Sequence, residues 1–342
     1  MKPPYRTPRE LADGGWMHPA RVPMLDAVAE RFAVSVSPEM AGLLRHESIA
    51  RQFLPSEAEL TSRAEDLADP IGDGAHSPVK GIVHRHPDRV LFKAVAVCAV
   101  YCRFCFRREM VGSNAPGVLA PDEMEAAYDY IAAHPEIWEV IVTGGDPFVL
   151  SPRRVQAITE RLAAIGHVKI VRWHTRVPVV DPASITDDFV AALIAPGVAS
   201  WIALHANAAE EFSPAARRAI ARLVDAGIQM VSQSVLLKGV NDSVEQLEAL
   251  MRIFVENRIK PYYLHHPDRA PGTSHFRMKI AQGRALVRAL RGRLSGIAVP
   301  TYVLDIPGGH AKVPLLSEDV VEVAPDHWRI RDHAGNWHDY RD

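Results

Sequence analysis

Residues 89–105 read RVLFKAVAVCAVYCRFC, an apolar run that three cysteines follow at once. We predict that residues 89–97 form a β-strand and that Cys98, Cys102 and Cys105 lie on the loop after it. Further apolar runs recur along the chain, and capped amphipathic stretches separate them. This alternation is typical of repeated βα units.

Six or so βα units in sequence predict an α/β fold with a parallel barrel, complete or partial. The five further runs that we predict as strands are residues 138–143, 168–173, 198–204, 228–232 and 259–264. Between them, Ser151-Pro152 and Ser213-Pro214 each place a capping residue before a proline at the first helical position. In such barrels the functional side chains lie at the C-terminal ends of the strands.

Polar residues follow each predicted strand, as that rule requires. After the cysteines they are Gly144-Gly145-Asp146, His174-Thr175-Arg176, His205-Ala206-Asn207, Gln233-Ser234 and His265 to Asp268. Strand-end loops are polar in many proteins, and this would explain each group alone. The general polarity of loops explains less well why polar residues follow all six predicted strands.

The three cysteines are the only ones in the chain, so they cannot all pair in disulfides. Clustered thiols in a reducing compartment usually bind a metal. Three thiolates on one loop can bind three irons of a [4Fe–4S] cluster and leave the fourth iron free for S-adenosylmethionine, which would yield a carbon radical on accepting an electron. The alternatives are buried structural cysteines or a zinc site, but zinc ligands usually come in two separated pairs.

Two glycine-rich segments are also candidates for cofactor contacts. The glycines of Gly144-Gly145-Asp146 would let the backbone approach a ligand, such as the methionine amine of S-adenosylmethionine, although such a sequence also forms ordinary turns. Lys312 follows the turn at residues 307–311. A desolvated lysine can lose its proton and form a Schiff base with an aldehyde cofactor, whereas a lone lysine is more often exposed to solvent.

Charged residues near the strand ends could bind a substrate. Asp268 and Asp305 follow the sixth and the last strand, and together they would bind an ammonium group, although each alone is more often a turn residue. Arg107 suits a substrate carboxylate. Arg85 and Arg89 are candidate phosphate ligands, although arginines more commonly form surface salt bridges.

Composition excludes several classes of protein. The formal net charge is −2 with Lys and Arg spread along the chain, so no nucleic-acid partner is expected. No stretch approaches the ~20 apolar residues of a membrane span, and no apolar signal core is present, so we expect a cytoplasmic protein. We divide the chain into an N-terminal helical accessory region (1–75), a barrel (76–313) and a C-terminal tail (314–342).

These residues resemble the lysine 2,3-aminomutase family of radical S-adenosylmethionine enzymes. The similarity runs from about residue 76 to residue 314. Besides the cysteine loop and Gly144-Gly145-Asp146, it includes residues 76–81, 84–92, 176–180, 233–237, 261–264, 275–277 and 307–309.

The resemblance implies a partial parallel (β/α) barrel of the radical S-adenosylmethionine type with an N-terminal helical extension. It implies that Cys98, Cys102 and Cys105 hold the cluster and that Lys312 holds pyridoxal phosphate. The substrate contacts would be Arg107 to the carboxylate and Asp268 with Asp305 to the ε-ammonium of lysine. The further cofactor contacts would be Arg85 and Arg89 to the phosphate, and His205 and Gln233 in the adenosyl pocket.

The implied reaction is the isomerisation of L-lysine to β-lysine by a 2,3-amino shift. An electron donor such as flavodoxin or ferredoxin would be needed, and a homo-oligomer is expected by analogy. Leu264-His265 favours the branch that makes β-lysine for modifying elongation factor P, whereas Tyr302 and Asp305 favour the metabolic branch. Other interpretations are a radical enzyme of this fold that acts on another amino acid or a macromolecule without pyridoxal phosphate, and an electron-transfer iron–sulfur protein.

Overall fold

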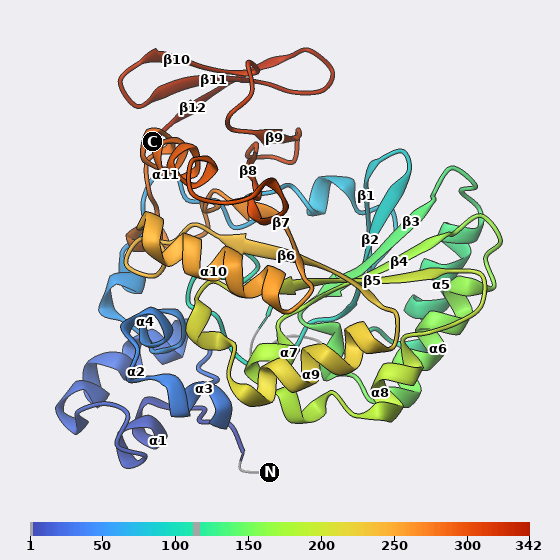
Figure 1. Ribbon diagram of the computed structural model, residues 1–342, viewed down its shortest axis with the longest axis horizontal. Coiled ribbons are helices and arrows are strands. Elements are labelled where there is room, and N and C mark those ends of the chain that lie inside the picture. Colours follow the sequence, from blue (N-terminus) through green and yellow to red (C-terminus); the bar gives the residue numbers. More distant parts are fainter. Residues whose placement is uncertain (1–2, 112–116) are drawn as a thin grey trace.

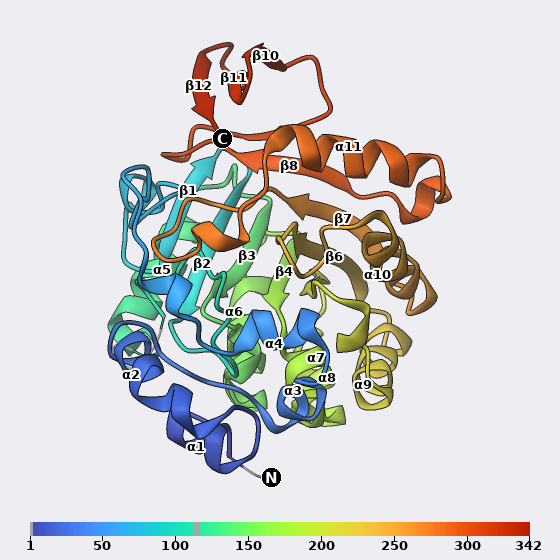
Figure 2. The same ribbon diagram turned by 90° about the vertical axis from the view of Figure 1, so that its left-hand side faces the viewer.

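The computed structural model describes residues 3–111 and 117–342. Its centre is a nine-stranded sheet in which the strands follow one another in sequence order, from β1 to β9. Strands β2 to β8 are parallel, and β1 and β9 pair antiparallel at the two edges. The sheet curls into a half-barrel (Figure 1, Figure 2). The predicted α/β partial barrel is therefore confirmed.

All six predicted strands are present, with ends shifted by at most three residues. The strands of the large sheet are β1 (Ile82–His86), β2 (Arg89–Val95), β3 (Glu139–Gly144), β4 (Ile170–Thr175), β5 (Ala199–His205), β6 (Gln229–Val235), β7 (Lys260–His265), β8 (Thr301–Asp305) and β9 (Lys312–Pro314). The edge strand β1 was not predicted. It is short and carries three polar residues, so its sequence lacks a continuous apolar run.

Helices cover the outer face of the half-barrel, and a separate group of helices lies near the N-terminus (Figure 1). The helices are α1 (Pro8–Asp13), α2 (Val22–Arg31), α3 (Pro38–Leu43), α4 (Glu47–Phe53), α5 (Pro121–Ala132), α6 (Pro152–Ala163), α7 (Val177–Val180), α8 (Asp187–Ala192), α9 (Pro214–Asp225), α10 (Val244–Glu256) and α11 (Ile280–Arg291). The hydroxyl of Ser213 caps α9 by accepting the N–H of Ala216 at 3.1 Å. Ser151 precedes α6, but its hydroxyl does not cap that helix, so among the described residues Pro152, at the first helical position, is the only start signal that the structure retains there.

The N-terminal helices and the barrel share one continuous apolar core, in which Leu25 and Phe53 pack in the same cluster as Val142 and Trp173. A second cluster joins α11 and β8 to the C-terminal residues. These residues form a three-stranded antiparallel sheet of β10 (Val320–Ala324), β11 (His327–Arg331) and β12 (Trp337–Arg341). Across residues 3–111 and 117–342, every helix is too short or too polar to traverse a bilayer.

A buried ionic cluster ties the N-terminal region to the cysteine loop. Glu59 is fully buried, and its carboxylate accepts from Arg103 Nη2 and Arg108 Nη2, both at 2.6 Å. Two backbone bonds add to this link, because Tyr101 N–H donates to the carbonyl of Ser35 and Arg103 N–H to that of Gln52, each at 2.9 Å. The position of the cysteine loop therefore depends on the N-terminal segment.

We expect Glu59→Gln to destabilise the protein because it leaves two buried guanidinium groups without a counter-charge. Breaking a buried ion pair from one side typically costs about 3 to 5 kcal/mol. Urea unfolding of the purified protein would measure the loss. Glu57→Gln is the matched control, since Glu57 lies two residues away and is exposed. Equal stability of the two variants would contradict this account of the loop.

Candidate active site

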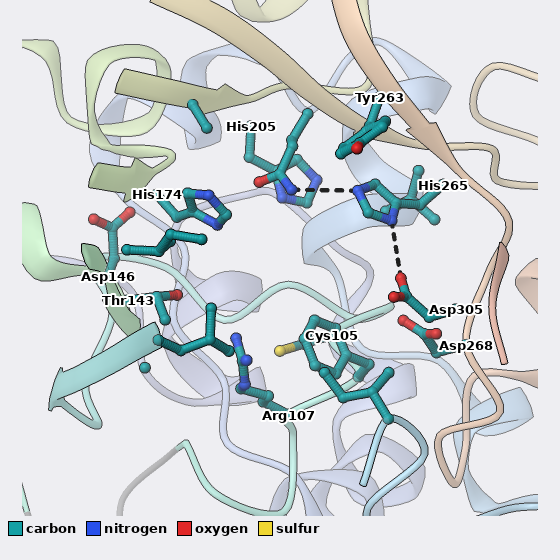
Figure 3. A pocket seen from close by; sticks show the side chains of 18 of the residues that line it. Cys105, Arg107, Thr143, Asp146, His174, His205, Tyr263, His265, Asp268 and Asp305 are labelled. Atoms are coloured by element: carbon teal, nitrogen blue, oxygen red, sulfur yellow. Dashed lines mark hydrogen bonds and ion pairs between the residues drawn. The ribbon is translucent and has the colours of Figure 1, made fainter. Parts of the chain in front are cut away.

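The concave side of the half-barrel contains a cavity of about 1400 Å³. Pockets for one small ligand typically measure roughly 300 to 1000 Å³, so this cavity has room for more than one. Its lining includes every site residue that the sequence predicts: Arg85, Arg89, Cys98, Cys102, Cys105, Arg107, Gly144, Gly145, Asp146, His205, Gln233, Asp268, Asp305 and Lys312. The close-up in Figure 3 shows how several of these side chains converge.

The cysteine loop forms one wall of the cavity. Cys98 is exposed to it, Cys102 and Cys105 are half-buried, and the N–H of Cys105 closes a turn on the carbonyl of Cys102 at 3.1 Å. Although Cys98 opens into the cavity, the surrounding protein shields all three sulfurs from bulk water, and this burial raises the pKa of each thiol, that of Cys105 to about 11. The thiols are therefore neutral near pH 7 in the free protein, and binding of a metal would release their protons.

The cysteine loop offers the ligands that a [4Fe–4S] cluster needs. In such a cluster each cysteine thiolate binds a different iron. Three cysteines on one loop at the wall of a large cavity fit that group.

Gly144 and Gly145 allow a close approach between the end of β3 and the backbone that leads into the cysteine loop. Gly144 has a φ of +116°, and a Cβ atom there would lie 2.2 Å from the carbonyl oxygen of Val95. A Cβ atom on Gly145 would lie 2.2 Å from the carbonyl oxygen of Val97. The glycines are thus required by this backbone contact, which the sequence did not reveal, and their contact with a ligand stays a prediction.

Asp146 braces the ends of β3 and β4. Its buried carboxylate accepts from the hydroxyl of Thr175 and the N–H of Arg176, both at 2.7 Å, and from the N–H of Phe148 at 3.0 Å. These bonds fix the strand ends on which the cavity wall depends.

Lys312 and two carboxylates form an acidic end of the cavity. The antiparallel pairing of β8 with β9 places Asp305 directly opposite Lys312, and the two side chains form an ion pair. Asp268 lies beside Asp305 (Figure 3). The pKa of Asp268 is raised to about 7, mainly by burial and secondly by the negative charge of Asp305. Although burial alone would raise the pKa of Asp305, the charge of Lys312 lowers it.

His265 connects this acidic end to the rest of the cavity. Its Nδ1 lies 3.4 Å from Lys312 Nζ and 3.4 Å from Asp305 Oδ2, while its Nε2 lies 3.3 Å from Gln233 Nε2. Burial, together with the charge of Lys312, lowers the pKa of His265. The imidazole is therefore neutral near pH 7, with Nε2 accepting from the Gln233 amide and the Nδ1–H facing Asp305.

A basic group of side chains surrounds one buried carboxylate, that of Asp73. Arg85 Nη2 lies 2.8 Å, Arg107 Nε 3.1 Å and Lys93 Nζ 3.5 Å from its oxygens. Although burial would raise the pKa of Asp73, the charges of Arg107, Lys93 and Arg85 lower it. Three cations share one anion, so the group keeps a net positive charge that suits a phosphate or a carboxylate.

The predicted arginines do not all lie in this basic group. Arg85 and Arg107 meet at Asp73, but Arg89 pairs with the exposed Asp88 at the β1–β2 turn, at 2.6 Å. Sequence reasoning missed Asp73 and Lys93, because an Asp-Gly pair in a loop and one lysine within a strand carry no motif.

Several buried nitrogens of the cavity wall have no partner among the described residues, as expected where a polar ligand binds. They include Nε2 of His174, Nε2 of His205 and Nε of Arg85. Burial lowers the pKa of both histidines, which makes them neutral hydrogen-bonding groups. The His205 side of the cavity therefore fits an uncharged polar group such as a nucleoside, and the Arg85 side fits an anion.

Family models and individual relatives of known function all relate this chain to the same group of enzymes. Residues 94–252 match the family model of the Radical SAM superfamily, and residues 287–342 match that of Lysine-2,3-aminomutase. The chain is 36% identical to the L-lysine 2,3-aminomutase of Fusobacterium nucleatum over 310 residues, which covers 90% of this chain and 72% of that protein. It is also 36% identical to the L-lysine 2,3-aminomutase of Clostridium subterminale over 290 residues, or 85% of this chain and 69% of that protein.

A relative named for another amino acid is nearly as similar. The chain is 33% identical to the glutamate 2,3-aminomutase of Clostridioides difficile over 312 residues, with 90% of this chain and 73% of that protein covered. Similarity of this degree identifies the reaction class but not the substrate. The chain belongs to the lysine 2,3-aminomutase family of radical S-adenosylmethionine aminomutases.

Proposed function

We propose that this aminomutase converts L-lysine to β-lysine and that it holds pyridoxal phosphate on Lys312. Family membership implies a [4Fe–4S] cluster and S-adenosylmethionine. When bound, these two supply radical chemistry that removes a hydrogen atom from the substrate, and pyridoxal phosphate supplies the carbonyl carbon to which the migrating nitrogen attaches. The single observation behind the choice of lysine is the pair of carboxylates, Asp268 and Asp305, on one wall of the cavity.

The charges of the cavity favour a substrate with a cationic side chain. In this proposal Arg107 binds the α-carboxylate as a two-pronged donor, and Asp268 with Asp305 binds the ε-ammonium. Anchoring both ends of the substrate would fix the reacting carbons between them, which lowers the entropic cost of the reaction. Glutamate would instead bring a negative side chain to the two carboxylates.

The state of Lys312 supports its proposed role. Its ammonium group is paired with Asp305, so reaction with an aldehyde requires loss of a proton from Nζ. His265 Nδ1, at 3.4 Å from both Nζ and Asp305 Oδ2, lies on the other side of this ion pair and helps to hold the two side chains together. Once Lys312 is no longer charged, the carboxylate of Asp305 is free to bind the substrate ammonium.

The other predicted residues would contact the cofactors and the cluster. The cofactor phosphate would be bound by Arg85 and Arg89, and the adenosyl group would be contacted by His205 and Gln233. Cys98, Cys102 and Cys105 would hold the cluster, and a reduced flavodoxin or ferredoxin would supply the electron. The same chemistry serves both the metabolic and the elongation factor P branch.

The direct test is an anaerobic assay of reconstituted protein with S-adenosylmethionine, a reductant, pyridoxal phosphate and either L-lysine or L-glutamate. We expect β-lysine from lysine and no β-glutamate, as measured by chromatography with mass spectrometry. Formation of β-glutamate with lysine returned unchanged would reject the substrate assignment and leave the reaction class intact.

Lysine binding should depend on pH through Asp268. Because the pKa of Asp268 is about 7, its carboxyl is increasingly protonated below that pH and loses its attraction for the ammonium group. We expect KM for lysine to be on the order of ten-fold higher at pH 6 than at pH 8. Asp268→Asn should raise KM at pH 8 by roughly 10- to 100-fold, the effect of losing a charged hydrogen bond, and remove this pH dependence. A wild-type KM that does not change with pH would contradict the role of Asp268.

Lys312→Ala should remove the covalent attachment of pyridoxal phosphate without removing iron. Lys312 contacts Asp305 and His265 rather than the cysteine loop, so the iron content should stay at the wild-type level. We expect the visible absorbance of the bound cofactor to disappear after gel filtration. Lys279→Ala is the control, since Lys279 is exposed and pairs with Asp326. A Lys312→Ala protein that retains this absorbance would show that another amine holds the cofactor.

A further inference from the structure

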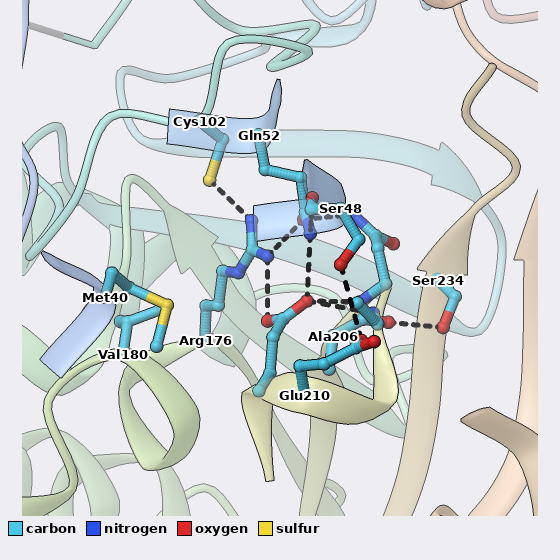
Figure 4. Close-up of polar contacts among 12 residues, drawn as sticks. Met40, Ser48, Gln52, Cys102, Arg176, Val180, Ala206, Glu210 and Ser234 are labelled. Atoms are coloured by element: carbon cyan, nitrogen blue, oxygen red, sulfur yellow. Dashed lines mark hydrogen bonds and ion pairs between the residues drawn. The ribbon is translucent and has the colours of Figure 1, made fainter. Parts of the chain in front are cut away.

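A buried arginine donates a hydrogen bond to one of the three cysteines. Arg176 follows the end of β4 and is 5% exposed. Its Nη1 lies 3.0 Å from Cys102 Sγ, and its Nη2 donates to Glu211 Oε2 at 2.8 Å and to the side-chain carbonyl of Gln52 (Figure 4). The guanidinium thus spans the distance between a cysteine sulfur and a buried carboxylate.

The partners of Arg176 are themselves fixed in place. Glu211 is fully buried, and its Oε1 accepts the N–H groups of Asn207 at 2.8 Å and Ala208 at 3.0 Å. Gln52 is also fully buried, and its amide donates to the carbonyl of Ser48 at 3.0 Å and to Glu211 at 3.3 Å. With Nη2 held by Glu211 and Gln52, the orientation of Nη1 toward Cys102 is determined.

Packing restricts the guanidinium further. It lies over the ring of Phe53, at 4.7 Å from the centroid, and over the ring of Phe104, at 5.4 Å. Because Glu211 balances its charge, Arg176 acts on the sulfur mainly through a directed N–H bond rather than through a net positive charge. The guanidinium is 5% exposed, and electrostatic interactions are stronger for groups that are largely buried.

We infer that Arg176 is a positioning residue that raises the reduction potential of the cluster through its hydrogen bond to the Cys102 thiolate. An added electron increases the negative charge on the cysteine sulfurs, so an N–H donor stabilises the reduced cluster more than the oxidised one. Gln52 and Glu211 serve this role by orienting the donor. The inference rests on the cluster alone and holds for either amino acid as substrate.

The test is a potentiometric titration of the reconstituted protein, followed by the electron paramagnetic resonance signal of the reduced cluster. S-adenosylmethionine is left out, so that no contact of Arg176 with it can affect the result. Arg176→Lys keeps the charge but cannot reach three acceptors at once. The double variant Arg176→Met with Glu211→Gln removes the donor while it conserves the net charge and leaves no buried carboxylate unpaired.

We expect both variants to bind iron at the wild-type level and to be reduced at a lower potential than the wild type. Arg172→Lys is the matched control, because Arg172 lies on β4, the strand that Arg176 follows, and pairs with Glu139 at 3.0 Å; its potential should equal that of the wild type. An unchanged potential in a variant that keeps its iron would overturn the inference. Loss of iron from both variants would also overturn it, since Arg176 would then hold the cluster loop in place rather than set the potential.

Discussion

The parallel pairing of β2 to β8 is the constraint on which the site depends. Parallel strands bring all their C-terminal ends to the same rim of the sheet, so each strand can contribute a side chain to one cavity without any long loop. The cysteine loop follows β2, the glycines end β3, and Asp305 ends β8. The final antiparallel step adds a residue from the start of a strand to the same rim. Since β9 returns alongside β8, Lys312 lies directly opposite Asp305.

The distribution of charge in the cavity follows from what burial allows. A buried charge is tolerated only with a partner, and two groups of side chains satisfy this rule with unequal numbers of positive and negative charges. Three cations share the carboxylate of Asp73, whereas Asp268 and Asp305 both lie near the single cation of Lys312. Burial, together with the negative charge of Asp305, raises the pKa of Asp268. A ligand that brings an anion to the first group and a cation to the second would relieve both imbalances.

The N-terminal segment is part of the site rather than an appendage. It supplies Glu59 and Gln52, which are fully buried against residues of the cysteine loop and of the β4 end. It also supplies Asp73, which holds Arg85 and Arg107. Near Asp73, Gly72 packs against the turn before Lys312, where a Cβ atom on Gly72 would lie 2.3 Å from the carbonyl oxygen of Gly308. The half-barrel therefore provides the strand ends, and the segment of residues 52–73 fixes how the loops after them are oriented.

The sequence by itself determined the βα repeat, the cysteine triplet and the polar residues at the strand ends, because these follow from local apolar runs; the roles of Lys312, Arg85 and Arg89 were implied by the resemblance. It did not show which side chains pair. Arg176 and Cys102 are 74 residues apart, and Arg107 and Asp73 are 34 apart, so no local pattern records either contact. It also did not reveal β1 or the C-terminal sheet, whose short, mixed polar strands become stable only against the finished core. Partner choice among buried charges is a matter of distance in space, and only the tertiary structure decided it.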